Sequence, residues 1–201
     1  MPLVADTVAG LARSPGLRPC LDWFRRERAW INEQHLALCR IAAPTFFEQK
    51  RAEWMTARFR AVGWESKLDR AGNVVAWLPG RRDDLSVAVT AHLDTVLAPR
   101  TADEIKFNGD GKMLGPGVAD NGAGLAALLA LAAAWNAAPP LEDPPLAPLL
   151  IANVGEEGEG NLCGMRYVCK NPETRASLAA RIKAFLVLDG PGTDQIGRAH
   201  V

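Results

Sequence analysis

The segment LSVAVTAHLD, residues 85–94, constrains the fold most strongly because it is apolar on both faces and ends in polar residues. A strand with two apolar faces must be covered on both sides, so we expect it in the centre of a sheet. Turn-forming residues bound other strand-like segments. These segments are 65–69, 73–79, 148–157 and 183–190, and a short hairpin is expected at 104–114 around the turn GDG.

Helical patterns alternate with these strands. Apolar spacing predicts one long amphipathic helix over 17–43, a second over 47–64 that ends at Gly63, and a third over 120–138. Short helices are expected at 161–171 and 176–182, on either side of Pro172, and a proline-rich surface loop at 139–148. Strands that alternate with helices predict an α/β domain with a mostly parallel central sheet flanked by helices.

Composition excludes several classes of partner. Lys and Arg total 23, and Asp and Glu also total 23, so neither a nucleic-acid surface nor a membrane surface is expected. The apolar run at 125–135 is too short to span a bilayer, and the first residues do not resemble a secretory signal. The cysteines lack CxxC spacing, which favours free thiols in a cytoplasmic protein. They are Cys20, Cys39, Cys163 and Cys169.

Acidic residues or a histidine stand at one end of four of the apolar segments, with Asp120 at the start of the helix over 120–138. Ligands of open α/β sheets bind where strands end, so these side chains are expected to gather at one edge. The group comprises His92 and Asp94, Asp120, Glu156 and Glu157, and Asp189. So many carboxylates cannot all stay ionised at short range unless cations neutralise them. A histidine with carboxylates suits zinc, with manganese or cobalt as alternatives.

The spacing assigns roles within this group. His92 and Asp94 are two positions apart on a strand, so they share a face, and Asp94 can orient a metal-bound His92. Asp120 could bridge two ions about 3.5–4 Å apart. Glu156 and Glu157 could diverge toward the attacking water and the metal, with Gly155 and Gly158 permitting the sharp backbone path. Each motif alone is ordinary: a strand-end salt bridge, a helix cap or turn, or a solvated loop. Together, in this order, they favour a metal centre.

The motifs AHLDTV, GPGVADNGAG, GEEGEGN and LDG resemble the co-catalytic dinuclear zinc peptidase and amidase family. This family includes carboxypeptidase G, peptidase T, aminoacylase, acetylornithine deacetylase and succinyl-diaminopimelate desuccinylase. The resemblance, over about residues 30–195, implies a zinc exopeptidase-like fold and two zinc ions per complete site. It implies that His92 and Asp189 bind one zinc, that Asp94 orients His92, and that Asp120 bridges the ions. Glu157 would bind the second zinc, and Glu156 would be the general base. Asn121 would form a strained peptide link with Asp120.

The chain also departs from the family pattern. The second zinc normally takes a histidine from near the end of a longer chain, and a lid and dimerisation domain is also expected there. His200 is in the wrong position for this ligand, and His35 is expected to have a surface or packing role. The last residues, IGRAHV, match one reading frame of a common sequencing adapter. We therefore expect 1–195 to be the N-terminal part of a catalytic domain and 196–201 to be a non-native tail. The complete protein would be about twice as long and homodimeric through its lid, and this chain alone would be inactive.

The expected function is hydrolysis of amide bonds through a metal-activated water, as in an exopeptidase of the peptidase T or carboxypeptidase G type. Its substrate would be a peptide. One alternative is a deacylase acting on N-acyl amino acids, and another is a fragment that binds metal without activity. Glu156 argues against the inactive module, because metal binding alone does not require a base. A nucleotide-binding domain is set aside because GxGxxG and GxxxxGK are both absent.

Overall fold

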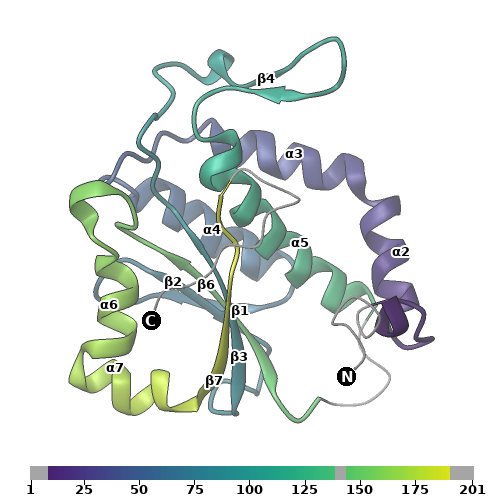
Figure 1. Cartoon of the computed structure of the whole chain (residues 1–201), viewed down its shortest axis with the longest axis vertical. Helices are drawn as coiled ribbons and strands as arrows, with labels where there is room; N and C mark the ends of the chain where they lie inside the picture. The colour runs from purple at the N-terminus through teal and green to yellow at the C-terminus, as the bar shows by residue number, and fades with distance from the viewer. Residues whose placement is uncertain (1–8, 139–143, 191–201) are drawn as a thin grey trace.

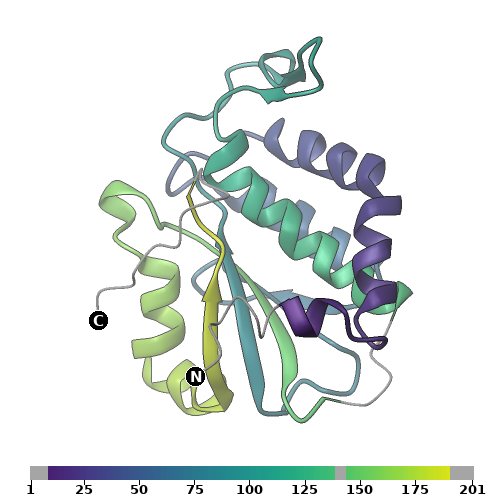
Figure 2. The ribbon, with the colours of Figure 1, turned by 45° about the vertical axis from the view of Figure 1, so that its right-hand side comes forward.

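The computed structural model describes residues 9–138 and 144–190, and in them a five-stranded sheet lies between two layers of helices (Figures 1 and 2). The strand order is β1-β2-β6-β3-β7. The strands are β1 (Glu65–Leu68), β2 (Val74–Trp77), β3 (Ser86–His92), β6 (Ala147–Asn153) and β7 (Ile182–Val187). The predicted α/β class is confirmed, with β3 inside the sheet as expected.

The sheet is mixed. β3 runs parallel to both β6 and β7, whereas β2 is antiparallel to its neighbours β6 and β1. In the parallel part, His92 at the end of β3 lies opposite Asn153 at the end of β6. Thr90 pairs with Val187 at the end of β7. The three strands therefore finish at one edge of the sheet, and the segments that follow them begin side by side.

Alternate residues of the strands enter two different cores. Val74, Ala76 and Leu150 pack beneath α3 (Arg28–Cys39), α4 (Gln49–Ala61) and α5 (Gly124–Ala137). Val75, Trp77 and Ile151 face the other way, toward Met165 of α6 (Cys163–Lys170) and Leu178 after α7 (Pro172–Ser177). Figure 2 shows α6 and α7 on one side of the sheet and the longer helices on the other.

The predicted long helix over 17–43 is wrong, because it is divided into α2 (Arg18–Arg26) and α3. Glu27 leaves the helical conformation, with φ −93° and ψ 17°. The bend lets both segments pack on α5: Trp23 is buried among alanines of α5, and Trp30 packs on the same cluster. Helix propensity could not reveal this break, because tertiary contacts impose it.

The second predicted short helix is also displaced. α7 begins at Pro172, and Asn171 caps it by accepting the backbone N–H groups of Glu173 and Thr174. A separate 3-10 turn follows at Ala179–Arg181. An Asn–Pro pair is a favourable helix start, which explains why the helix begins before the apolar residues expected to define it.

The third predicted helix becomes regular only at Gly124, after a kinked turn over Val118–Ala123 in which Asp120 (φ −116°, ψ 99°) is not helical. By length and composition alone, Val118–Ala137 could cross a membrane. Nine residues of α5 are buried, however, and the helix lies against the sheet (Figure 1). This is the environment of a core helix, which is apolar on all sides because it is covered on all sides.

The remaining predicted elements are close to those observed. The hairpin consists of β4 (Lys106–Phe107) and β5 (Met113–Leu114), which stand away from the main sheet (Figure 1). α4 ends just before Gly63, whose positive φ of 88° suits the end of a helix. Residues 139–143 of the proline-rich loop, and the segment 196–201 with His200, lie outside the described residues.

Candidate metal centre

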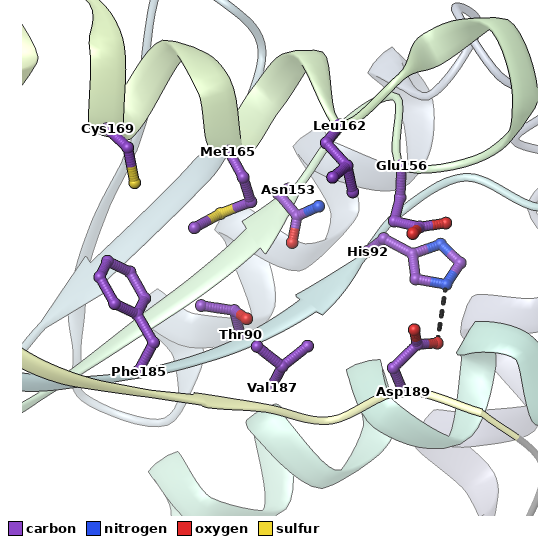
Figure 3. Close-up of a pocket in the computed structure, with 10 residues that line it drawn as sticks. All are labelled: Thr90, His92, Asn153, Glu156, Leu162, Met165, Cys169, Phe185, Val187 and Asp189. Atoms are coloured by element: carbon purple, nitrogen blue, oxygen red, sulfur yellow. Dashed lines mark ion pairs between the residues drawn. The ribbon is translucent and has the colours of Figure 1, made fainter. Parts of the chain in front are cut away.

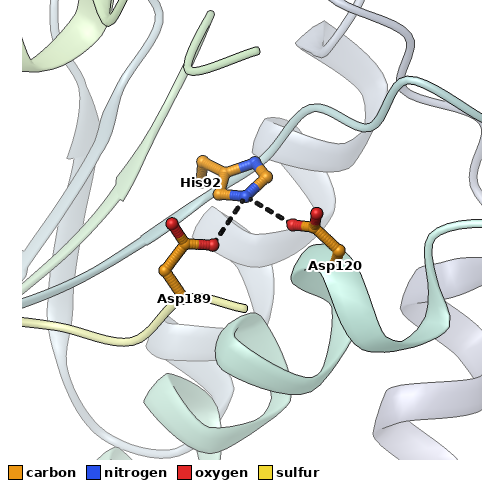
Figure 4. Close-up of side chains that lie close together, drawn as sticks. All are labelled: His92, Asp120 and Asp189. Carbon is orange, nitrogen blue, oxygen red and sulfur yellow. Dashed lines mark hydrogen bonds and ion pairs between the residues drawn. The ribbon is translucent and has the colours of Figure 1, made fainter. Parts of the chain in front are cut away.

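His92 lies at the centre of the polar cluster. It is the last residue of β3 and is 3% exposed. Its Nε2 atom lies 2.9 Å from Oδ1 of Asp120 and 3.4 Å from Oδ1 of Asp189 (Figure 4). The two aspartates are about half exposed, so the side of the cluster away from the sheet is open to solvent. One atom from each of these three side chains lies within 4.8 Å of the others, which is close enough to share an ion.

Glu156 and Glu157 approach the same histidine from the end of β6. Their carboxylates and the His92 ring form a second group whose ligand atoms lie within 4.8 Å of one another. Figure 3 shows Glu156 and Asp189 on opposite sides of the His92 ring. Gly155 has φ 58° and Gly158 has φ 48°, so both glycines adopt the left-handed conformation that the expected sharp path requires. All the predicted residues thus gather at one edge of the sheet, while their individual roles stay predictions.

Asp94 has more partners than the sequence indicated. It is fully buried, and its carboxylate accepts the backbone N–H groups of Glu156 and Glu157, each at 3.0 Å. It also accepts the hydroxyl of Thr45 at 2.9 Å. The Nδ1 atom of His92 lies 3.0 Å from the Asp94 carbonyl oxygen and 3.4 Å from its Oδ1. Asp94 therefore orients His92 partly through its backbone, while its side chain holds the loop of the two glutamates.

Thr45 provides a direct test of this loop support. Replacing Thr45 by valine keeps the side-chain shape and removes the hydroxyl that Asp94 accepts. We expect the free energy of unfolding to fall by about 1–2 kcal/mol, because the bond is made to a buried charged group. Urea denaturation of the variant and the wild type would measure the difference, and equal midpoints would show that this bond contributes nothing.

The pKa shifts in the cluster show that its carboxylates favour a positive charge beside them. Burial opposes the charge of His92, but the contact with Asp94 and the carboxylates of Glu156 and Asp120 raise its pKa to about 9. Burial likewise opposes ionisation of Asp94, yet His92 and the two backbone N–H groups lower its pKa to about 2. Burial, joined by neighbouring carboxylates, raises the pKa of both Glu156 and Glu157. Imidazole nitrogen and carboxylate oxygens are suitable zinc ligands, so the donor set fits a divalent cation.

The turn that carries Asp120 is held on two sides. The Asp120–Asn121 peptide bond is cis, and it joins the two residues between which the family resemblance implied a strained link. The Asn121 side chain donates to the Leu188 carbonyl at 2.8 Å and accepts the Gly124 N–H at 3.1 Å. It thereby joins the turn to the residue before Asp189. His35 is partly buried, with Nε2 lying 2.8 Å from the Val118 carbonyl, and so contacts this turn without joining the cluster.

Sequence reasoning missed the positions that support the cluster. Thr45 lies in a short loop after Pro44, where nothing in the local pattern indicates a bond to Asp94. Asn121 was noticed only through the family resemblance, and its side-chain contacts were not expected. A DNG triplet is a turn signal that could have indicated a structural amide, but its partner Leu188 lies 67 positions away.

A cavity of about 250 Å³ adjoins the cluster (Figure 3). His92, Glu156 and Asp189 form its polar end, and the remaining wall is mainly apolar. Its apolar side chains come from α6, from the residue before that helix and from β7, and they are Leu162, Met165, Phe185 and Val187. The cluster therefore borders a space into which a molecule can enter.

Comparison with known proteins identifies the family. The model described as "Peptidase family M28" matches residues 73–199, which is more than half of the chain and contains the whole cluster. This chain belongs to peptidase family M28. The predicted membership of the co-catalytic zinc peptidases is thereby confirmed. No curated protein matches the chain in sequence.

Solved structures share the fold of this M28 chain. The dipeptidase Dug1p from Saccharomyces cerevisiae aligns with a TM-score of 0.67 and 13% identity, over 87% of this chain and 41% of that one. Human carnosine dipeptidase 1 aligns with a TM-score of 0.66 and 14% identity, over 87% of this chain and 41% of that one. Aminopeptidase PepT from Bacillus cereus aligns with a TM-score of 0.55 and 23% identity, over 81% of this chain and 43% of that one. The M28 chain therefore spans less than half the length of each of these proteins.

Proposed function

We propose that this chain is the N-terminal part of a metal-dependent exopeptidase that hydrolyses short peptides and uses zinc. The observation that carries the proposal is the meeting of two ligand groups at His92, one with Asp120 and Asp189 and one with Glu156 and Glu157. Membership of a peptidase family supports the reaction. The likeness in fold to proteins named as dipeptidases and an aminopeptidase supports a short peptide as the substrate.

The cluster supplies ligands for two cations. His92 and Asp189 would hold one, Glu157 would contribute to the other, and Asp120 would be shared between them. When bound, such cations act as Lewis acids toward the substrate carbonyl and toward water. Among the described residues, His92 is the one histidine of the cluster.

Glu156 is the general base in this proposal. Its carboxylate belongs to the cluster and borders the cavity, and burial raises its pKa above the ordinary value, which favours proton transfer by this group. It would accept a proton from the attacking water and later donate that proton to the leaving nitrogen. Asp94 is fully buried, so it would not touch the substrate. It keeps His92 and the backbone of Glu156 and Glu157 in place.

The exposed side chains of β7 support the proposal that more of the protein covers this chain. Among the described residues β7 is the last strand of the sheet, and Phe185, Leu186 and Val187 are 42%, 55% and 63% exposed. Neighbouring residues of a strand point to opposite faces, so both faces of this parallel strand expose apolar surface. We propose that a further segment of a longer, cytoplasmic protein covers β7, and that the complete enzyme dimerises through a lid domain.

The experiment is performed on the protein expressed from its complete gene. We expect two equivalents of zinc by metal analysis and release of terminal residues from dipeptides or tripeptides. N-acyl amino acids serve as the comparison substrates. Faster hydrolysis of those would establish the deacylase alternative, and bound metal with no turnover of either class would show a binding module.

A further inference from the structure

Glu48 is a buried carboxylate that the proposed reaction does not use. It stands immediately before α4 and is 6% exposed. Its Oε1 atom accepts the backbone N–H of Gly155 at 3.0 Å and that of Phe46 at 3.1 Å. Gly155 directly precedes Glu156, so the carboxylate of Glu48 holds the backbone at the point where the two glutamates leave β6.

Arg51 performs a similar task in the first turn of α4. It is fully buried, and its Nη1 donates to the Leu93 carbonyl at 2.7 Å. Its Nε and Nη2 atoms donate to the Ile41 carbonyl at 3.0 and 2.6 Å. Leu93 lies between His92 and Asp94. The first turn of α4 is therefore bonded to the segments that follow both β3 and β6.

Two buried ionic groups are a costly way to fill this space. Removing a carboxylate and a guanidinium from water is unfavourable for both groups, and apolar side chains of similar size often stabilise a fold as well or better. The presence of Glu48 and Arg51 here is explained if they fix the geometry of the backbone to which they bond. Neither group lies in the cluster itself, but each bonds to the backbone of a residue next to a proposed ligand or base.

We propose that Glu48 is a positioning residue of the metal centre, fixing Gly155 so that Glu156 and Glu157 point to the water and the metal. Arg51 anchors the His92–Asp94 segment to the same helix turn. The distance between His92 and the two glutamates is then set by α4, a helix that packs on one face of the sheet. This inference rests on the proposed function.

The test compares three substitutions in the protein expressed from its complete gene. Glu48→Ala removes the acceptor of the Gly155 N–H, whereas Glu48→Gln keeps an acceptor oxygen at the same distance and removes the charge. Glu53→Ala is the matched control, because Glu53 is an exposed residue of the same helix that pairs with Gln49. We expect Glu48→Ala to lower kcat and zinc affinity by about tenfold to a hundredfold, as loss of outer partners of a metal site does. KM should stay unchanged, Glu48→Gln should recover most of the loss, and the control should resemble the wild type.

The absorption spectrum of the cobalt-substituted protein gives a readout independent of turnover. We expect the cobalt bands to shift in Glu48→Ala and to return in Glu48→Gln. A variant with a lower melting temperature but an unchanged cobalt spectrum, zinc affinity and kcat would overturn the inference, because Glu48 would then only stabilise the fold. If Glu48→Ala does not fold, Glu48→Asp, which withdraws the carboxylate by one methylene, takes its place with the same expectations. The metal measurements decide the role of Glu48 even if the wild type hydrolyses no peptide, an outcome that would contradict the proposed function instead.

Discussion

Replacing Glu156 by glutamine is expected to lower kcat about a thousandfold, within the range that general acid–base catalysis contributes. Glutamine has a similar shape but cannot accept the proton of the attacking water. Zinc content should not change, because Glu156 is assigned to the water and Glu157 to the metal. Steady-state hydrolysis of a dipeptide, with metal analysis of the same sample, measures both quantities.

Glu159→Gln is the control for this prediction. Glu159 lies in the same loop, on an exposed 3-10 turn. The Glu159→Gln variant should be as active as the wild type. If Glu156→Gln lost zinc together with activity, the assignment of base and ligand within the glutamate pair would be reversed. Glu157→Gln would then be expected to keep its metal and lose turnover.

Replacing Asp120 by alanine is expected to abolish hydrolysis and to weaken metal binding by more than about a hundredfold, beyond the usual cost of losing an outer hydrogen-bond partner. Asp120 is the carboxylate assigned to both ions, and its Oδ1 lies 2.9 Å from Nε2 of His92. Its side chain is 47% exposed, so the fold should tolerate the change. Chelator competition measures the affinity, and circular dichroism verifies that the variant is folded.

Asp110→Ala is the matched control for Asp120→Ala. Asp110 is an exposed aspartate in the turn between β4 and β5, outside the cluster. The Asp110→Ala variant should bind two equivalents of zinc and hydrolyse peptides at the wild-type rate. Retention of both ions by Asp120→Ala would contradict the bridging assignment and would require another carboxylate, such as that of Asp189, whose Oδ1 lies 3.4 Å from Nε2 of His92.

Local sequence predicted that these side chains gather at one edge because of a property of parallel strands. Strands β3, β6 and β7 run in the same direction, so residues that follow them must meet at one edge of the sheet. His92, Glu156 and Asp189 each follow or end an apolar run that is recognisable by itself. Their convergence needed no knowledge of distances, only the inference that the segments are neighbouring parallel strands.

The supporting bonds could not be predicted in this way. Glu48 contacts Gly155 across 107 positions, and Arg51 contacts Leu93 across 42. Within their own segment both residues read as ordinary polar positions of a helix. A hydrogen bond between distant segments depends on how the helix packs on the sheet, which local periodicity does not specify. The break at Glu27 has the same origin, because it follows the surface of α5.

The sequence by itself therefore determined the α/β class, the central position of β3 and the gathering of six polar residues, five after or at strand ends and Asp120 before a helix, since periodicity and strand direction are local properties. Only the tertiary structure decided how Asp94 joins the two loops and how Asn121 secures the turn of Asp120. It also decided how Glu48 and Arg51, at the start of α4, bond to the segments that follow β6 and β3. These contacts link residues that are remote in the chain, and they form only after the two layers of helices have packed on the sheet.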